Sequence, residues 1–307
     1  MTVVFFVFGI ANKWILLGLV FMTEGKGTLY LCATPIGNLE DITLRVLRVL
    51  READLIAAED TRHTRKLLSH FDIHTPMTSY HRHNHKTKSE YLLRLLSEGR
   101  SIALVSDAGV PGISDPGADL AAAAISRQLP VVPLPGASAG ITALVISGLP
   151  TDAFVFEGFL PTAKKSRRDK LQSLSSEQRP IILYEAPHRL VHVLEDILEI
   201  CGDGNVSVSR ELTKKHEETI RGAVTEVLDH FRYTEPRGEF CVVLQNPTYR
   251  PVAMDDMPRA RPAEHVALLE KEGMPRKEAI RVAAQLYGLS RREVYRLVLD
   301  DKDNLPD

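Results

Sequence analysis

Short apolar stretches alternate with amphipathic stretches along most of the chain, and this alternation predicts β-strands separated by helices. In the first half, each predicted strand is rich in Val, Ile or Leu and is bounded by turn residues. The strands are predicted at residues 28–33, 54–59, 101–107 and 131–135, and the helices at 43–53, 89–99, 117–127 and 137–148. This order predicts an α/β domain with a mainly parallel sheet over residues 27–150.

A second alternating set predicts a second α/β domain over residues 151–247. Its strands are predicted at residues 153–158, 180–186, 205–211 and 238–245, and its helices at 165–174, 188–200 and 225–232. A proline-rich stretch over residues 248–262 then predicts a linker.

The last part of the chain, residues 263–307, predicts a small helical module of helix-turn-helix type. Helices are predicted at 263–273, 276–288 and 290–301. Ser290 and Glu293 form a capping box that begins the last helix, and Gly288 ends the one before it. The predicted core is Val282, Ala283, Leu286, Val294, Leu297 and Val298, and the predicted exterior is Arg276, Lys277, Arg291 and Arg292.

Residues 1–26 begin with an apolar leader, interrupted only by Asn12 and Lys13 up to Met22. Three interpretations are open: a transmembrane anchor, a signal peptide, or a misassigned start with translation beginning at Met22. Lys13 would cost roughly 2.5–3.5 kcal/mol in the centre of a bilayer, and no basic region precedes the leader. We favour the misassigned start and expect a cytoplasmic protein without stable membrane association.

Composition limits the partners and the compartment. The net charge of -2 gives no general attraction to nucleic acid, so any such binding has to rest on local basic patches. Cys32, Cys201 and Cys241 have no metal-ligand spacing, and they fit buried thiols in a reducing compartment. We therefore expect no metal site, even at His81, His83 and His85.

Glycine- and proline-rich loops follow the predicted strands of the first domain. They are TPIGNLED, AEDTRHT, DAGVPGISDPG and PGASAG, beginning at residues 34, 58, 107 and 135. Ligands of open α/β sheets bind outside the carboxyl ends of the strands, so the four loops together predict a cofactor site. DAGVPGISDPG contains no lysine or arginine and two aspartates, which disfavours a polyphosphate. A nucleoside with a positive group, such as S-adenosylmethionine, fits better.

The loops belong to a longer series of motifs between about Gly27 and Gln245. The first motif is TLYLCATPIGNLEDITLRVLRVLREADLIAAEDTRHTRKLLSHF. It is followed along the chain by SDAGVPGISDPG, PLPGASAGITAL, FEGFLP, LYEAPHRL and RELTKKHEE. In these motifs the chain resembles the ribosomal RNA small subunit methyltransferase I family. The resemblance implies two α/β domains of the tetrapyrrole methylase type with the cofactor between them, and a homodimer. It implies 2′-O-methylation of a cytidine ribose in the decoding region of 16S rRNA, with S-adenosylmethionine as donor and the rRNA or the 30S subunit as partner.

The resemblance also implies a set of cofactor-binding residues. Most lie in the loops after the predicted strands, and Tyr184, beside Glu185, lies at the end of a strand of the second domain. The set is Pro35, Asp107, Ala108, Gly109, Val110, Pro111, Gly112, Pro135, Gly136, Ala137, Ser138 and Tyr184.

Transfer of a methyl group to a hydroxyl requires alignment of the two groups and benefits from a base, since the hydroxyl loses its proton. Candidates in loops at strand ends are Glu59, Asp60, Glu211 and Glu217, with Lys214 as a base only if its pKa is depressed. The alternative is that these acids hold loops or pair with neighbouring arginines.

Two basic patches predict contacts with RNA phosphates, although a run of charges is commonly only a solvated surface. They lie at residues 81–88 and 163–170, and the predicted RNA-binding residues are Arg82, Lys86, Lys88, Lys164, Lys165, Arg167 and Arg168.

Two other functions stay open at this level. A tetrapyrrole methylase shares the fold class and donor, but typically has a GDP-type loop in place of DAGVPG and lacks the helical module. A nucleic-acid-binding regulator that senses a small molecule would not need the reactive groups of LYEAPHRL and RELTKKHEE.

Overall fold

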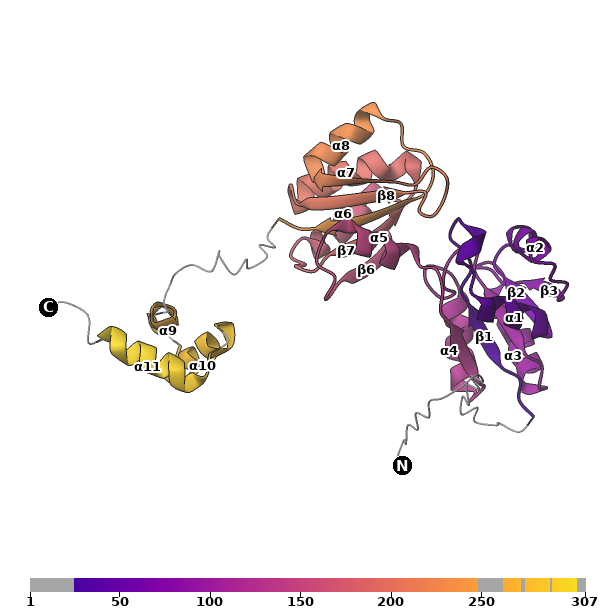
Figure 1. Ribbon diagram of the computed structural model, residues 1–307, viewed down its shortest axis with the longest axis horizontal. Helices are drawn as coiled ribbons and strands as arrows, with labels where there is room; N and C mark the ends of the chain where they lie inside the picture. The colour runs from indigo at the N-terminus through magenta and orange to yellow at the C-terminus, as the bar shows by residue number, and fades with distance from the viewer. Residues whose placement is uncertain (1–24, 248–261, 272–273, 288, 303–307) are drawn as a thin grey trace, which may run out of the picture. The chain divides into compact units, whose positions relative to one another are not determined.

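The computed structural model of the protein describes residues 25–247, 262–271, 274–287 and 289–302 (Figure 1). Contacts group these residues into one compact unit within residues 1–248 and a second within residues 249–307. Most of the apolar leader, most of the proline-rich linker and Gly288 lie outside the described residues. No helix in the described ranges is long and apolar enough to cross a membrane.

The first sheet is wholly parallel, as predicted for the first α/β domain. Its order is β3-β2-β4-β1-β5. Successive residues of each strand face opposite sides, so α3 and α4 cover one face and α1 and α2 cover the other. The strands are β1 (Leu29–Cys32), β2 (Leu55–Ala58), β3 (Met77–Ser79), β4 (Ile102–Val105) and β5 (Val131–Leu134). The helices are α1 (Leu44–Glu52), α2 (Thr61–His70), α3 (His85–Ser97) and α4 (Gly117–Ser126), with a 3₁₀ turn, η1, at Leu39–Asp41.

Two elements of this half were not predicted. The α2 helix begins inside AEDTRHT, where the Asp60 side chain accepts a hydrogen bond from the Arg62 N–H at 2.8 Å and caps the helix. The β3 strand has only three residues, all half-buried, and pairs only with β2 at the edge of the sheet. A strand this short has too little alternation to be recognised from sequence.

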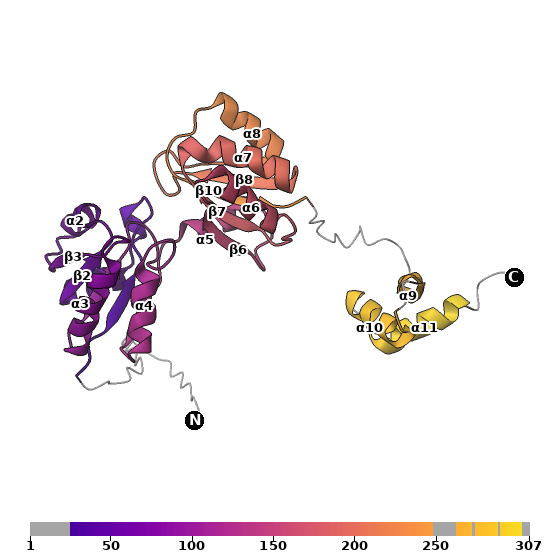
Figure 2. The ribbon, with the colours of Figure 1, turned by 180° about the vertical axis from the view of Figure 1, so that it is seen from behind.

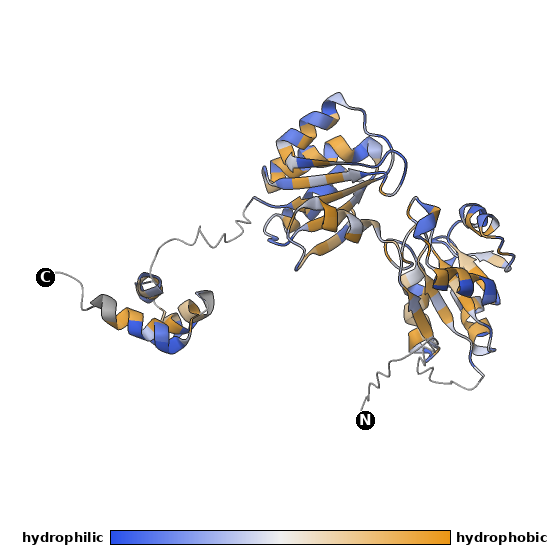
Figure 3. Ribbon diagram, viewed as in Figure 1, coloured by the Kyte–Doolittle hydropathy of each residue, from blue (hydrophilic) through white to orange (hydrophobic). Residues whose placement is uncertain are grey.

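The second sheet is mixed. Its order is β6-β7-β10-β8-β9, and only β6 and β7 are parallel. The strands are β6 (Val155–Phe159), β7 (Ile181–Glu185), β8 (Asn205–Arg210), β9 (Glu218–Ala223) and β10 (Phe240–Gln245). Three helices cover one face: α6 (Lys164–Leu174), α7 (Pro187–Cys201) and α8 (Val224–Tyr233). Figure 2 shows the sheets from behind. Figure 3 shows the hydropathy of their residues in the view of Figure 1. The half-buried edge strand β9 was not predicted.

The other face of the second sheet is covered by α5 (Ala139–Ser147), which follows β5 of the first sheet. Ala143 and Leu144 of α5 are buried with Ile182 and Val243 of the second sheet. This helix was predicted in the first α/β domain, but it packs on the second sheet. The order of elements along the chain does not determine which sheet receives a connecting helix.

The helical module consists of α9 (Pro262–Lys271), α10 (Arg276–Leu286) and α11 (Arg291–Lys302), which share a core. Ala283, Val294 and Val298 are buried in it as predicted, whereas Leu297 is 40% exposed and does not belong to it. The predicted capping box is present, because Ser290 and Glu293 exchange backbone-to-side-chain hydrogen bonds of 2.7 and 3.2 Å. The side chain of Leu286 lies outside the described residues.

Candidate cofactor and active site

A cavity of about 470 Å³ lies where loops of the first sheet meet strand ends of the second sheet. Loops after β1, β2 and β4 and the N-terminus of α5 contribute one part of its wall. The ends of β6, β7, β8 and β10, the loop after β8 and the N-terminus of α7 contribute the rest. The volume is within the range of small-molecule and cofactor sites.

The DAGVPG loop is folded by its own backbone and by one aspartate. Gly109 has a φ of +80°, which favours glycine, and it pairs with Thr34 through two backbone hydrogen bonds of 2.9 and 3.0 Å. The carboxylate of Asp115 accepts from the N–H groups of Gly112 and Gly117, at 2.7 to 2.9 Å. The loop is therefore held in shape without the help of a ligand.

Glu59 and Asp107 connect the loops that follow β2 and β4. The Asp60 N–H donates to the Asp107 carboxylate at 2.9 Å, and the Asp107 N–H donates to Glu59 Oε2 at 3.4 Å. Both acids line the cavity. Burial raises the pKa of Glu59, and the charges of Asp107 and Asp115 add to the shift, against the opposing hydrogen bond from the Asp107 N–H. Glu59 is therefore a better proton acceptor than an ordinary carboxylate.

Tyr184, at the end of β7, connects the second-sheet side of the cavity wall to α5. Its hydroxyl accepts a hydrogen bond from the Gly140 N–H at 3.1 Å, and its ring makes edge contacts with Phe156 and Phe159 at centroid distances of 5.2 and 5.6 Å. A Cβ at Gly140 would lie 3.3 Å from the tyrosine oxygen, so a glycine suits this close approach. Tyr184 and Phe159 give the cavity an aromatic wall.

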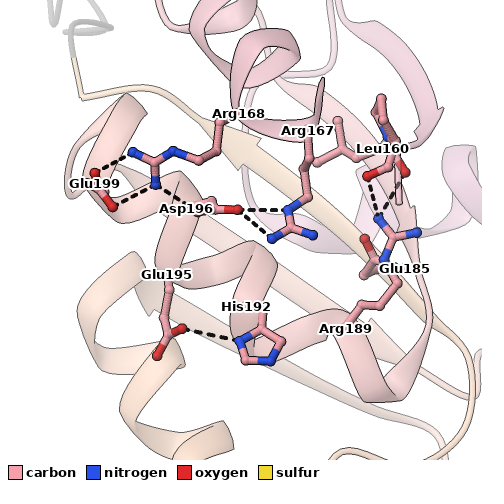
Figure 4. A network of polar contacts seen from close by, with 10 residues as sticks. Leu160, Arg167, Arg168, Glu185, Arg189, His192, Glu195, Asp196 and Glu199 are labelled. Carbon is pink, nitrogen blue, oxygen red and sulfur yellow. Dashed lines mark hydrogen bonds and ion pairs between the residues drawn. The ribbon is translucent and has the colours of Figure 1, made fainter. Parts of the chain in front are cut away.

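Glu185 is the most deeply buried carboxylate of the cavity wall, with 2% of its surface exposed. Oε1 accepts from the Ala186 N–H at 2.8 Å and lies 3.1 Å from the Arg189 Nε. The guanidinium of Arg189 also donates to the Leu160 carbonyl, so it is fixed (Figure 4). Oε2 is buried and has no hydrogen-bond partner among the described residues. Burial without a partner favours the neutral, protonated form of this carboxyl.

The burial of Glu185 predicts a measurable pH dependence of stability. Burial raises its pKa above the ordinary 4.5, and the neighbouring arginines only partly oppose this. The folded state therefore binds the proton more tightly than the unfolded state, and stability falls as pH rises through the raised pKa. We expect the E185Q variant to gain stability relative to the wild type across this window, with no pH-dependent difference below about pH 4.5.

Denaturant titrations at a series of pH values test this expectation. The control is E199Q, because the hydrogen bond from Arg168 lowers the pKa of Glu199. The wild type should be more stable than E199Q at neutral pH, and this advantage should be lost as pH falls through the lowered pKa. A difference between E185Q and the wild type that does not change with pH would contradict the assignment.

Four other candidates for the base behave differently from Glu59. The hydrogen bond to Arg62 lowers the pKa of Asp60, which makes it a poor base. Burial disfavours the charge on Lys214, but hydrogen bonds of 2.9 and 3.0 Å to Glu211 and Glu239 outweigh burial and raise its pKa. The condition for Lys214 to act as a base is therefore not met.

Glu211 and Glu217 serve the loop after β8. Although burial opposes ionisation of Glu211, hydrogen bonds from Lys214 and from the Glu239 N–H lower its pKa. Glu217 is exposed and accepts from the Thr213 N–H. Neither acid lines the cavity, and both hold backbone, which was the alternative interpretation of these residues.

The charges around the cavity select its ligand. Several acidic side chains line the cavity, and Lys214 is the only lysine or arginine among the described residues that line it. The carboxylates are Glu59, Asp107, Asp115, Glu185 and Glu239. Such a wall repels a polyphosphate and favours a cationic ligand. This fits the sulfonium and ammonium groups of S-adenosylmethionine.

About half of the predicted cofactor-binding residues line the cavity. These are Asp107, Ala108, Gly109, Val110, Ser138 and Tyr184, whereas Pro35, Pro111, Gly112, Pro135, Gly136 and Ala137 lie in the same loops without lining it. Gly136 has a packing reason, since a Cβ there would lie 2.7 Å from the Cβ of Ala33. The cavity is also lined by residues that were not predicted, which include Asp115, Phe159, Ser209, Leu212, Glu239 and Phe240. Of these, Asp115, Phe159 and Leu212 lie in the motifs DAGVPGISDPG, FEGFLP and RELTKKHEE, whereas the other three lie outside the quoted motifs.

Two predicted RNA-binding residues are engaged in ion pairs. Arg167 is 7% exposed, and its guanidinium binds Asp196 at 2.7 Å, which disfavours the predicted contact with phosphate (Figure 4). Arg168 is bound to Asp196 and Glu199. A buried guanidinium needs its counter-charge more than an exposed one does.

The other basic residues are more accessible. Lys86, Lys164 and Lys165 are exposed and form no ion pair with another described residue. Arg82 donates to the Ser114 carbonyl at 2.9 Å, and Lys88 donates to Thr78 at 2.9 Å. The described part of the chain contains no group of His, Cys, Asp or Glu side chains that could hold a metal ion.

Comparisons with known proteins agree with this arrangement. Residues 28–228 match the family Tetrapyrrole (Corrin/Porphyrin) Methylases, and residues 260–302 match the RsmI C-terminal HTH domain. The chain is 48% identical over 276 residues to the ribosomal RNA small subunit methyltransferase I of Halalkalibacterium halodurans, covering 89% of this chain and 95% of the relative. It is 49% identical over 277 residues to the protein of that name from Synechocystis sp., covering 89% of this chain and 98% of the relative.

A solved structure resembles the fold. It is the uroporphyrin-III C-methyltransferase of Thermus thermophilus complexed with S-adenyl homocysteine, with a TM-score of 0.51 and 16% identity. The match covers 71% of this chain and 97% of the solved one. At this identity the likeness establishes the fold and not the substrate.

Proposed function

Because the chain belongs to the ribosomal RNA small subunit methyltransferase I family and is a methyltransferase, we propose that it methylates 16S rRNA with S-adenosylmethionine as donor. The acceptor is the 2′-hydroxyl of a cytidine ribose in the decoding region of the small ribosomal subunit. The enzyme acts in the cytoplasm as a homodimer on the rRNA or the 30S subunit.

The observation that carries the donor is the acidic cavity, whose wall contains five carboxyl groups and one lysine among the described residues. Bound S-adenosylmethionine supplies an electrophilic methyl group on a positively charged sulfur. The backbone from Asp107 to Val110 and the aromatic wall of Tyr184 and Phe159 would hold this cofactor. Burial of the cavity wall strengthens the attraction between its carboxylates and the positive groups.

The proton of the ribose hydroxyl goes to Glu59 in this proposal. Among the acids predicted as bases, Glu59 is the one that lines the cavity and has a raised pKa. The hydrogen bond from the Asp107 N–H holds its side chain beside the cofactor loop. A carboxyl with a raised pKa takes up a proton at a pH closer to neutral, which is what a general base requires.

RNA capture uses the exposed lysines next to the cavity-lining strands. We expect K164Q/K165Q to bind 30S subunits more weakly, with a slope of log Kobs against log salt shallower by about 1.4 to 1.8, because two phosphate contacts are lost. The control is K170Q, since Lys170 is bound to Glu157 at 2.6 Å. Filter binding at several salt concentrations measures the slopes. An unchanged slope for the double variant would show that these two lysines do not contact RNA phosphates.

One experiment tests the function as a whole. The purified protein is incubated with methyl-labelled S-adenosylmethionine and either 30S subunits from a strain lacking the modification or a porphyrinogen. We expect label at one rRNA nucleotide, and alkali resistance of the adjoining phosphodiester, because methylation blocks the 2′-hydroxyl that alkaline cleavage needs. Label in the porphyrinogen alone would assign the protein to tetrapyrrole methylation instead.

A further inference from the structure

The α11 helix of the helical module has an exposed face that the module does not use for its own packing. Val294 and Val298 are buried against the other helices of the module. Residues 292, 295, 296 and 299 share a different side of the helix at the spacing of adjacent turns. We call Arg292, Tyr295, Arg296 and Leu299 the arginine–tyrosine face.

The composition of this face is unusual for a solvated helix. Tyr295 is 50% exposed and Leu299 is 43% exposed, although both are large apolar side chains. Arg292 and Arg296 are exposed on either side of Tyr295 in the sequence, and neither forms an ion pair with another described residue. By contrast, Arg281 of α10 is paired with Glu278 of its own helix. The face therefore combines two exposed guanidinium groups with an exposed aromatic ring, although Glu293 lies close enough to Arg296 for that charge to add to the hydrogen bonds with Ser290 in lowering the pKa of Glu293.

We propose that the arginine–tyrosine face is a second RNA-contact surface, on which Tyr295 stacks with an unpaired base while Arg292 and Arg296 contact the flanking phosphates. Single-stranded RNA is bound by this combination of aromatic stacking and guanidinium groups. A protein partner would favour a wider apolar patch that becomes fully desolvated at its centre, whereas charged side chains flank Tyr295 here. The inference rests on the proposed RNA substrate.

The capping box and the core of the module hold α11, which carries the arginine–tyrosine face, in a fixed position. Ser290 and Glu293 hold the first turn of α11, next to Arg292. Val294 and Val298 fix the rotation of the helix, because both are buried in the core of the module. The two guanidinium groups are therefore carried on a rigid backbone, which lowers the entropy lost on binding.

The test uses the full-length protein, 30S subunits lacking the modification and a single-stranded RNA dodecamer of mixed sequence. We expect Y295A to weaken binding of both the 30S subunits and the dodecamer about tenfold. The slope of log Kobs against log salt should not change, because stacking involves no net charge. Y295F should bind like the wild type. R292Q/R296Q should weaken binding and make the slope shallower by about 1.4 for the dodecamer. Matched controls are L297A, an apolar truncation away from the face, and R281Q.

The outcomes separate the alternatives. Wild-type affinity in both Y295A and R292Q/R296Q overturns the proposal. Weaker binding to 30S subunits with unchanged dodecamer binding overturns it in favour of a ribosomal protein, and a loss of self-association in Y295A overturns it in favour of a second copy of the chain. The proposed function fails on a different result, which is that the wild type labels no rRNA.

Discussion

The D107A variant should lose about 100-fold in affinity for S-adenosylmethionine, because Asp107 serves the cavity in two ways. Its carboxylate lines the cavity, and it accepts the Asp60 N–H at 2.9 Å, which connects two cofactor loops. Loss of one hydrogen bond to a charged group costs about 1.5–3 kcal/mol, and a 100-fold loss corresponds to about 2.7 kcal/mol. Isothermal calorimetry with the donor, or with its demethylated product, measures the change.

Two comparisons sharpen this expectation. D107N keeps an oxygen that can accept the Asp60 N–H but removes the negative charge. If D107N is as weak as D107A, the charge attracts the cationic ligand; if D107N binds like the wild type, Asp107 acts by organising the loops. D119A is the control, since Asp119 is an exposed aspartate of α4 that does not line the cavity. Normal affinity in D107A would disprove a role for Asp107 in the cofactor site.

The D196A variant should lose about 3–5 kcal/mol of stability, because it leaves a buried guanidinium without its counter-charge. The side chains of Asp196 and Arg167 are 6% and 8% exposed, and Asp196 also binds Arg168 at 2.9 Å (Figure 4). The measurement is the midpoint of denaturant unfolding, compared at an unchanged m value.

The outer end of the same network supplies the control. Glu199 binds Arg168 and its side chain is 66% exposed, so E199A should destabilise the protein much less than D196A. The R167M/D196L variant should recover much of the loss in D196A, since it removes both buried charges. A destabilisation in D196A no larger than in E199A would contradict a structural role for this pair.

Local sequence patterns were sufficient for most elements and for the position of the site. Strand-length apolar stretches predicted β1, β4, β7 and β10, and glycine- and proline-rich loops after the strands of the first sheet pointed to the cavity wall. Patterns of this kind reflect backbone geometry and alternation, which each segment carries within itself. The edge strands β3 and β9 were not predicted, because half-buried strands show too weak an alternation of apolar and polar residues.

The roles of individual side chains were harder to predict than the elements. The basic run at residues 163–170 gave Arg167 and Lys164 the same predicted role, yet one is buried beside Asp196 and the other is exposed. The sequence likewise did not distinguish Glu59 from Asp60 as a candidate base. Glu59 lines the cavity, whereas Asp60, its neighbour, caps α2 and pairs with Arg62.

The sequence by itself therefore determined the α/β class, the helical module, the cofactor loops and, through its motifs, the family. The tertiary structure alone decided that α5 packs on the second sheet and that Glu185 is buried in the cavity wall. It also decided that Arg167 is buried in an ion pair with Asp196. The reason is physical: backbone preferences are local, whereas burial, ion pairing and pKa depend on neighbours from distant parts of the chain.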